Sequence, residues 1–145
     1  MQLISWVKKH SLEIIFLQSL VAMAGSLFFS EIQNLAPCIL CWYQRIAIYP
    51  IVAISAVAIW YGDKKAYRYI LPLSIIGGLI AFYHNLLAYK FIPEAVAPCT
   101  FGVSCVTQYV AWFGFITIPF LSFVDLAVIT VCALLQKKTI DADPK

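Results

Sequence analysis

Apolar residues occur along this chain in four long runs, which are separated by shorter and more polar segments. The runs cover about residues 12–30, 42–61, 69–89 and 110–135. Each run is close to the roughly 20 residues that an α-helix needs to cross a lipid bilayer. The pattern therefore predicts an all-α integral membrane protein, a bundle of four transmembrane helices that forms a single domain over residues 1–145.

Composition agrees with a protein that is surrounded by lipid. Apolar residues make up 63 % of the chain, charged residues make up 12 %, and the mean hydropathy is +0.88. A soluble globular protein is nearer half apolar and a quarter charged. The net charge of +3 is small, and Lys and Arg lie near the ends of the apolar runs. This distribution argues against a nucleic-acid partner and for a signal that orients a membrane protein.

The first apolar run has a second interpretation. Residues 22–24, Ala-Met-Ala, resemble a signal-peptidase site, so the run could be a signal peptide that is removed. However, apolar residues continue beyond this site through Phe29, as a retained transmembrane helix requires. We therefore expect the segment to be retained as the first span.

The positions of Lys and Arg predict how the bundle is oriented. Four spans place both termini on one side, together with the turn between the second and third runs. The other side carries only two basic residues, Arg45 and Lys90. The side with the termini carries eight, namely Lys8, Lys9, Lys64, Lys65, Arg68, Lys137, Lys138 and Lys145. Because positively charged loops stay in the cytoplasm, we expect both termini to be cytoplasmic. Two short external loops, 31–41 and 90–109, would then face outward from the cell membrane.

Each of these two loops carries a pair of cysteines, although the orientation was derived without them. Cys38 and Cys41 lie in the first loop, and Cys99 and Cys105 lie in the second. Disulfides persist outside the cytoplasm. Redox exchange, structural disulfides with three possible pairings, and a four-thiolate zinc site are all compatible with this spacing. Zinc is less favoured because external thiols tend to oxidise. Cys132 lies near the inner end of the fourth run and is most simply an apolar filler.

Residues 37–45, Pro-Cys-Ile-Leu-Cys-Trp-Tyr-Gln-Arg, favour redox exchange. Asn34 and Pro37 are start signals for a helix, which would hold both cysteines in its first turns. Unpaired N–H groups and the helix dipole favour a thiolate there, and the thiolate is the reactive form of cysteine. Arg45 follows Cys41 by four residues, so we expect its guanidinium to extend toward that sulfur.

The same string resembles a known family. P-C-x-L-C-W-Y-Q-R, together with two cysteine loops and four spans, is similar to the disulfide-bond formation protein B (DsbB) family. Phe82-Tyr83-His84 and the segment 112–119, Trp-Phe-Gly-Phe-Ile-Thr-Ile-Pro, are supporting matches. The short Cys-x5-Cys second loop resembles the Gram-positive-type, BdbC-like members. The resemblance covers nearly the whole chain.

The resemblance implies a membrane thiol:quinone oxidoreductase that supports disulfide bond formation. By this resemblance, an extracytoplasmic, thioredoxin-like (DsbA-like) dithiol oxidase attacks Cys99 of a Cys99–Cys105 disulfide. Cys105 then exchanges with Cys38–Cys41, and Cys41 passes electrons to a membrane quinone, either a ubiquinone or a menaquinone. All four cysteines are thus expected to be catalytic, and no metal is expected.

The resemblance also implies that Arg45 and His84 contact the quinone. They lie about 5 and 7 Å inside the outer ends of the second and third spans, so they can meet just below Cys41. A guanidinium and an imidazole can donate hydrogen bonds to quinone carbonyl oxygens. The simpler alternatives are that Arg45 extends to the interface and that His84 makes an interhelical hydrogen bond.

Asp125 is the remaining unusual residue, since an acid within a span is costly in lipid. Counted from residue 110, it lies about 22 Å below the outer face, too deep to meet His84. We expect a packing contact or a neutral acid near Gln18 and Ser55.

Two other functions are compatible with the pattern. A vitamin-K-epoxide-reductase-like enzyme also combines a four-helix bundle with paired cysteines, but the string at residues 37–45 disfavours it. A non-enzymatic four-span scaffold with structural disulfides is the alternative from a different class of protein. Exchangeable bridges should open under mild reductant, whereas structural ones should resist.

Overall fold

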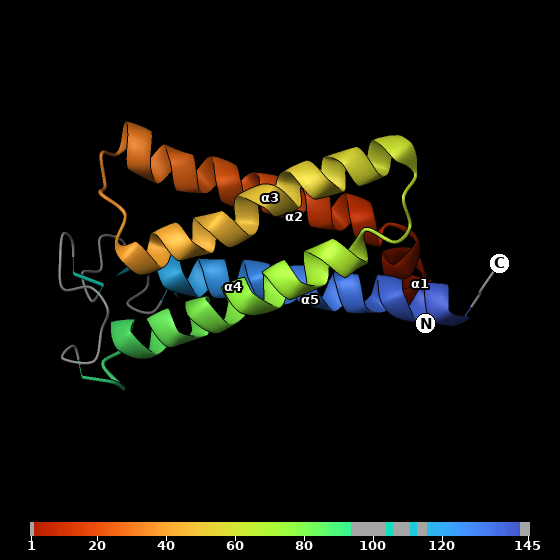
Figure 1. Cartoon of the computed structure of the whole chain (residues 1–145). Helices are drawn as coiled ribbons and strands as arrows, with labels where there is room; N and C mark the ends of the chain where they lie inside the picture. The colour runs from red at the N-terminus through yellow and green to blue at the C-terminus, as the bar shows by residue number, and fades with distance from the viewer. Residues whose placement is uncertain (1, 94–103, 106–110, 113–115, 143–145) are drawn as a thin grey trace.

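The computed structural model describes residues 2–93, 104–105, 111–112 and 116–142 (Figure 1). Four of its helices are long and apolar enough to cross a membrane, which confirms the predicted fold class. The helices are α1 (Gln2–Lys9), α2 (Ser11–Leu27), the π-helix η1 (Phe28–Ile32) that continues α2, α3 (Ile39–Tyr61), α4 (Tyr67–Ala88) and α5 (Ile118–Ala142).

The four long helices are arranged in a ring. Helix α2 packs on α3 and α5, and α4 packs on the same two helices. Helix α1, the α3–α4 turn and the end of α5 lie at one end of the bundle, and α3 begins at the opposite end (Figure 1). We call the end that holds Cys38 and Cys105 the cysteine end. Which side of the membrane it faces stays a prediction.

The fourth long helix begins at Ile118, so the predicted start at residue 110 is wrong. Ala111–Trp112 (β1) pairs antiparallel with Ile116–Thr117 (β2) before the helix begins. The Thr117 hydroxyl then accepts a hydrogen bond from the Phe120 N–H at 3.3 Å, as a helix cap does. Pro119 is tolerated in a first turn, where its missing N–H is not needed. Hydropathy alone does not separate an apolar strand from an apolar helix.

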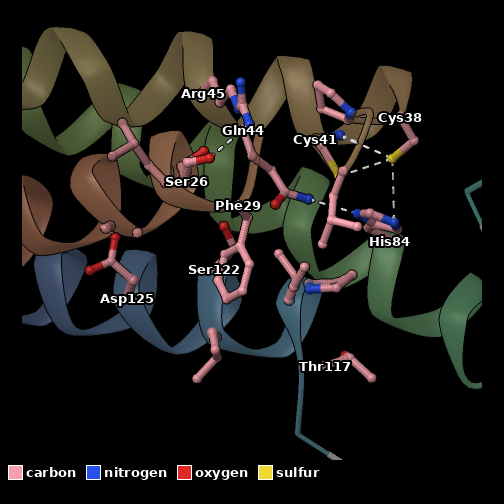
Figure 2. Close-up of a pocket in the computed structure, with 18 of the residues that line it drawn as sticks. Ser26, Phe29, Cys38, Cys41, Gln44, Arg45, His84, Thr117, Ser122 and Asp125 are labelled. Atoms are coloured by element: carbon pink, nitrogen blue, oxygen red, sulfur yellow. Dashed lines mark hydrogen bonds between the residues drawn. The ribbon is translucent and has the colours of Figure 1, made fainter. Parts of the chain in front are cut away.

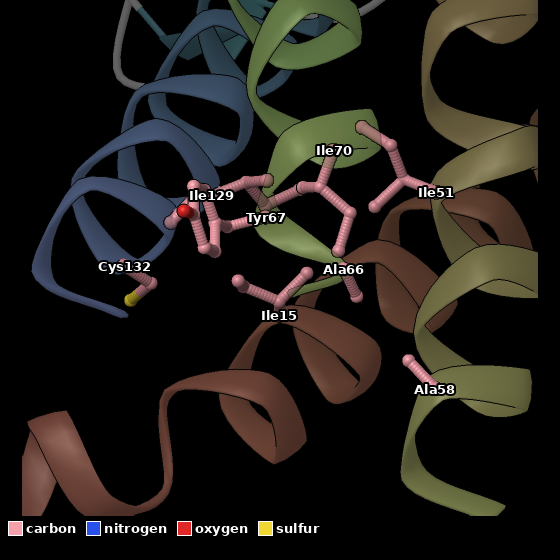
Figure 3. Close-up of a cluster of buried hydrophobic side chains, with 9 residues drawn as sticks. Ile15, Ile51, Ala58, Ala66, Tyr67, Ile70, Ile129 and Cys132 are labelled. Carbon is pink, nitrogen blue, oxygen red and sulfur yellow. The ribbon is translucent and has the colours of Figure 1, made fainter. Parts of the chain in front are cut away.

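The half of the bundle away from the cysteines is closely packed. Ile15, Ile51, Ile70 and Ile129 are 0 % exposed and meet in one cluster, each from a different long helix (Figure 3). Cys132 is 5 % exposed and packs in the same cluster, as expected of an apolar filler. This cluster holds all four helices together.

Helices α3 and α4 pack closely against each other at Gly77 of α4. A Cβ atom at this position would lie 2.7 Å from the Ala47 Cβ and 3.2 Å from the Leu126 side chain. Distances under about 3 Å are not tolerated in a packed interior, so glycine is required here. The close contact sets the distance between the two helices that carry the cysteine motif and His84.

Candidate active site

Cys38 and Cys41 lie in the first turn of α3, as predicted. The helix begins at Ile39, and Cys38 is its N-cap with extended backbone angles, φ −72° and ψ 168°. The Cys38 sulfur accepts a hydrogen bond from the Cys41 backbone N–H at 3.4 Å. The two sulfur atoms lie 3.0 Å apart, and both residues are free thiols. A cysteine thus takes the capping role in place of the usual Ser, Thr, Asp or Asn.

His84 links the cysteine motif to the second loop. Its side chain is 2 % exposed, and its Nε2 lies 3.1 Å from the Cys105 carbonyl oxygen and 3.8 Å from the Cys38 sulfur. Its Nδ1 lies 3.0 Å from the Gln44 Nε2. A carbonyl oxygen only accepts and an amide nitrogen only donates. Nε2 therefore donates toward the Cys105 carbonyl oxygen, and the ring is held between Gln44 of α3 and the second loop.

These contacts make Cys38 an acidic thiol. Its hydrogen bond with the Cys41 thiol is the largest cause that lowers the pKa of Cys38, to about 4, and the neighbouring His84 lowers it further while burial opposes both. The thiolate is the nucleophile in disulfide exchange. The reactive form is therefore favoured at Cys38, the cysteine farther from Arg45.

Sulfur atoms from the two loops come together beside His84. The reactive atoms of Cys38, His84 and Cys105 all lie within 4.8 Å of one another, and all three residues are buried. Cys105 is disulfide-bonded, and Cys99 lies outside the described residues. Because zinc binds thiolates, a disulfide sulfur is not a suitable ligand. A thiol held beside a disulfide is instead the arrangement that exchange requires.

A cavity of about 370 Å³ lies below the cysteines. Its volume is within the roughly 300–1,000 Å³ that small-molecule sites occupy. Most of its wall is apolar, with Cys41, Gln44 and His84 at one end (Figure 2). Asp125 lies at the end opposite Cys38, and Arg45 and Ser26 lie between the two ends. Such a cavity suits a flat apolar ring that carries polar groups at its edges.

Comparison with known proteins agrees with this geometry. The family described as Disulfide bond formation protein DsbB matches residues 8–136. This chain belongs to the DsbB family.

Individual DsbB-family relatives match most of the chain. Disulfide bond formation protein C of Bacillus subtilis (strain 168) is 46 % identical over 125 residues, 83 % of this chain and 89 % of the relative. Probable disulfide formation protein C of Halalkalibacterium halodurans is 45 % identical over 121 residues, 83 % and 88 % of the two chains. Probable disulfide formation protein of Oceanobacillus iheyensis is 44 % identical over 131 residues, 88 % of each chain. No solved structure gives a significant match.

Membership in the DsbB family confirms the resemblance and favours it over a vitamin-K-epoxide-reductase-like enzyme. The protein is a multi-pass membrane protein with a role in disulfide bond formation, and its chemistry is of the oxidoreductase type.

Arg45 lies in the DsbB-family motif and lines the cavity, but its guanidinium does not extend as predicted. Its Nη2 donates a hydrogen bond to the Ser26 carbonyl oxygen of α2 at 3.0 Å, and its Cζ lies 5.2 Å from the centre of the Trp42 ring. Helix α2 changes to the π-helix η1 at Phe28, two residues after Ser26. The guanidinium is thus directed across the bundle to α2 because an acceptor is available there.

Sequence reasoning missed two residues of the site. Gln44 is 3 % exposed and holds the His84 ring, whereas the sequence analysis gives it no role of its own. Its position one helical turn after Cys41 places both residues on one face, which is the signal that could have found it. Asp125 was placed too deep because the start of α5 was wrong. It follows Ile118 by seven residues and so lies about 10 Å into the helix.

Proposed function

We propose that this DsbB-family protein is a thiol:quinone oxidoreductase that reoxidises an extracytoplasmic, thioredoxin-like dithiol oxidase. The observation that carries the proposal is the position of the Cys38 thiol. Its sulfur lies within 4.8 Å of the sulfur of the disulfide-bonded Cys105, while its partner Cys41 lines the apolar cavity. In this proposal both cysteine loops face outward and both termini are cytoplasmic.

The first step is disulfide exchange in the second loop. A thiolate of the reduced partner attacks Cys99 of the Cys99–Cys105 disulfide, and Cys105 leaves as a thiolate. The second thiol of the partner then attacks the mixed disulfide. The partner departs with a new disulfide, and two electrons remain on Cys99 and Cys105 as thiols.

The second step moves those electrons to the first loop. The Cys105 thiolate attacks Cys38 of a Cys38–Cys41 disulfide, and Cys41 leaves as a thiolate. Cys99 then displaces Cys38, which restores the second-loop disulfide and leaves Cys38 and Cys41 as a dithiol. The neighbouring Cys41 thiol and His84 Nε2, which can both donate to the Cys38 sulfur, stabilise Cys38 as the leaving thiolate. A dithiol beside a disulfide-bonded Cys105 is the arrangement this step produces.

The residues around the cavity fit a quinone as the electron acceptor. A bound quinone supplies the oxidising power, since it takes up the two electrons and two protons that are released as the Cys38–Cys41 disulfide re-forms. Cys41 is the thiol that lines the cavity. Arg45, which lies between the two ends of the cavity, would donate a hydrogen bond to a carbonyl oxygen of the ring, and charge that develops on the oxygen is stabilised by such preorganised donors. His84 and Gln44 line the same end and hold the Cys38 thiolate in place.

Quinone reduction by the purified protein tests the proposal. The protein in detergent is mixed with a reduced thioredoxin-like oxidase and a short-chain benzoquinone or naphthoquinone, and quinone absorbance is followed. We expect absorbance to fall with the wild type and to stay constant with Cys41→Ser. Cys132→Ser is the matched control, because that residue packs in the cluster away from the site, and it should retain activity. No loss with the wild type, or an equal loss with Cys41→Ser, contradicts the proposal.

The scaffold alternative is not favoured by the site. Stable structural bridges would leave no reactive thiol, whereas Cys38 and Cys41 are free thiols that lie next to a disulfide-bonded Cys105. Trapping with a single-cysteine variant of the partner separates the two functions. We expect a mixed disulfide with the oxidised wild-type protein, and a scaffold would form none under mild conditions.

A further inference from the structure

Asp125 is an acidic residue in the cavity that none of these steps uses. Its side chain is 5 % exposed, and neither carboxyl oxygen has a hydrogen-bond partner. Gln18 lies beside the carboxyl without completing a hydrogen bond of normal geometry. A buried polar group without a partner costs about 1–3 kcal/mol. A residue that keeps this cost in a cavity wall is a candidate for contact with whatever fills the cavity.

The position of Asp125 makes that contact geometrically reasonable. It follows the start of α5 by seven residues, and Arg45 follows the start of α3 by six, so both lie about 10 Å into their helices. Both line the same cavity, and Asp125 occupies the end opposite Cys38 (Figure 2). A ligand that meets Cys41 with one edge and extends along the cavity presents its other edge to Asp125.

We propose that Asp125 binds the polar edge of the quinone that lies farther from Cys41. This inference rests on the proposed function. A quinone carries two carbonyl oxygens on opposite edges of its ring, and the cysteine end of the cavity offers donors to only one of them. In its protonated form, a carboxyl group carries one O–H donor. That donor completes a hydrogen bond with the second carbonyl oxygen and fixes the orientation of the ring below Cys41.

The competing explanation is purely structural. Asp125 would then contact Gln18 to join α5 to α2, and the cavity ligand would not sense it. The two explanations differ in what a substitution changes. A ligand contact affects quinone affinity, whereas a helix contact affects stability and should respond equally to loss of Gln18.

The experiment compares four variants in detergent: Asp125→Leu, Asp125→Asn, Gln18→Leu and Thr130→Val. Asp125→Asn keeps a hydrogen-bond donor, and Thr130→Val is the control, since its hydroxyl bonds only the Leu126 carbonyl of its own helix among the described contacts. Affinity for a short-chain benzoquinone is read from the rise in melting temperature with quinone concentration, which requires no turnover. The KM for quinone, kcat and formation of the mixed disulfide with the partner are measured alongside.

We expect Asp125→Leu to weaken quinone binding and raise the KM about tenfold, the effect of one lost hydrogen bond. Formation of the mixed disulfide should be unchanged, and Asp125→Asn should bind nearly as the wild type does. Thr130→Val should bind quinone normally, and Gln18→Leu, which also changes the cavity wall, should lose less affinity than Asp125→Leu. If Asp125→Leu does not fold, Asp125→Ala gives the same comparison with Asp125→Asn.

Two results overturn the role of Asp125, and a third refutes the proposed function. Unchanged quinone affinity in Asp125→Leu, with a wild type that binds and reduces quinone, removes the role of Asp125 and leaves the proposed function intact. An equal loss of affinity in Gln18→Leu assigns the effect to the helix contact. A wild type that neither binds nor reduces quinone refutes the proposed function itself.

Discussion

The two halves of the bundle are built differently. Away from the cysteines, one isoleucine from each long helix meets in a cluster in which all four side chains are 0 % exposed. At the cysteine end, the same helices enclose a cavity of about 370 Å³ that is bordered by thiols, an imidazole, a guanidinium and a carboxyl. The isoleucine cluster needs no polar partner, whereas the polar side chains around the cavity need partners that are placed individually.

The comparison shows where stability and reactivity reside in this protein. Lipid is as apolar as the core, so helix association depends on close packing and on interhelical hydrogen bonds. The packed half supplies the close packing. The cysteine end can then hold Asp125 and Asn85, whose side-chain oxygens lack a hydrogen-bond partner, although Gln136 Oε1 at the opposite end lacks one as well. The predictions below test whether the two halves are separable in this way.

The largest expected effect is on the reactivity of Cys38. Cys41 is the main cause of its lowered pKa, about 4 against an ordinary value of 9.0. In the reduced wild type, Cys38 is therefore already a thiolate at neutral pH, and its alkylation rate should be flat between about pH 6 and pH 8. In Cys41→Ala the pKa rises, so the rate should increase up to about tenfold per pH unit over that range.

Alkylation at Cys38 is measured by peptide mapping after short exposure to iodoacetamide. Cys132→Ala serves as the control, because it removes a thiol from the packed half and should leave the flat profile unchanged. A flat profile in Cys41→Ala would mean that His84 or the helix start, rather than Cys41, sets the reactivity of Cys38.

The next effect is on stability and concerns the packed half. Ile129 is 0 % exposed, so Ile129→Ala should lower the free energy of unfolding by about 2 kcal/mol or more through lost packing contacts. Val131→Ala is the matched control on the same helix, since Val131 is 55 % exposed and should cost little. Thermal unfolding in detergent measures the loss of stability in both variants. Quinone reduction per folded molecule should stay near the wild-type rate, and a large fall there would mean that the halves are not separable.

The smallest effect concerns Gln44, which holds the His84 ring at 3.0 Å. Gln44→Leu should leave the imidazole in the site but less well oriented, so quinone reduction should slow by about tenfold or less. Gln44→Asn, whose side chain is one methylene shorter, should be affected similarly. Equal rates for Gln44→Leu and the wild type, measured with quinone in excess, would show that His84 needs no such support.

The sequence by itself determined the features that depend on local composition. Four apolar runs of membrane-spanning length, two loops with cysteine pairs and the cysteine motif at the start of a helix could all be inferred without a structure. Each depends on the hydropathy or spacing of neighbouring residues, which lipid and helix geometry translate directly into structure. The motif at residues 37–45 also identified the family.

The start of α5 has a signal in the local sequence, but the apolar residues before it resemble a continuation of the helix. Ala111–Trp112 and Ile116–Thr117 are as apolar as a helix, and the cap at Thr117 followed by Pro119 is the signal that was overlooked. That error displaced Asp125 by eight residues along its helix. A position within a membrane is only as accurate as the helix end from which it is counted.

Only the tertiary structure decided which polar side chains meet. The Gln44–His84 contact joins residues 40 apart, and the Arg45–Ser26 contact joins residues 19 apart. Whether a guanidinium extends toward Cys41 or toward the Ser26 carbonyl depends on the neighbouring helix that offers an acceptor, and residue spacing within one helix carries no such information. Helix packing, set by contacts such as Gly77 on Ala47, brings the acidic thiol of Cys38, the disulfide-bonded Cys105 and the cavity into one site.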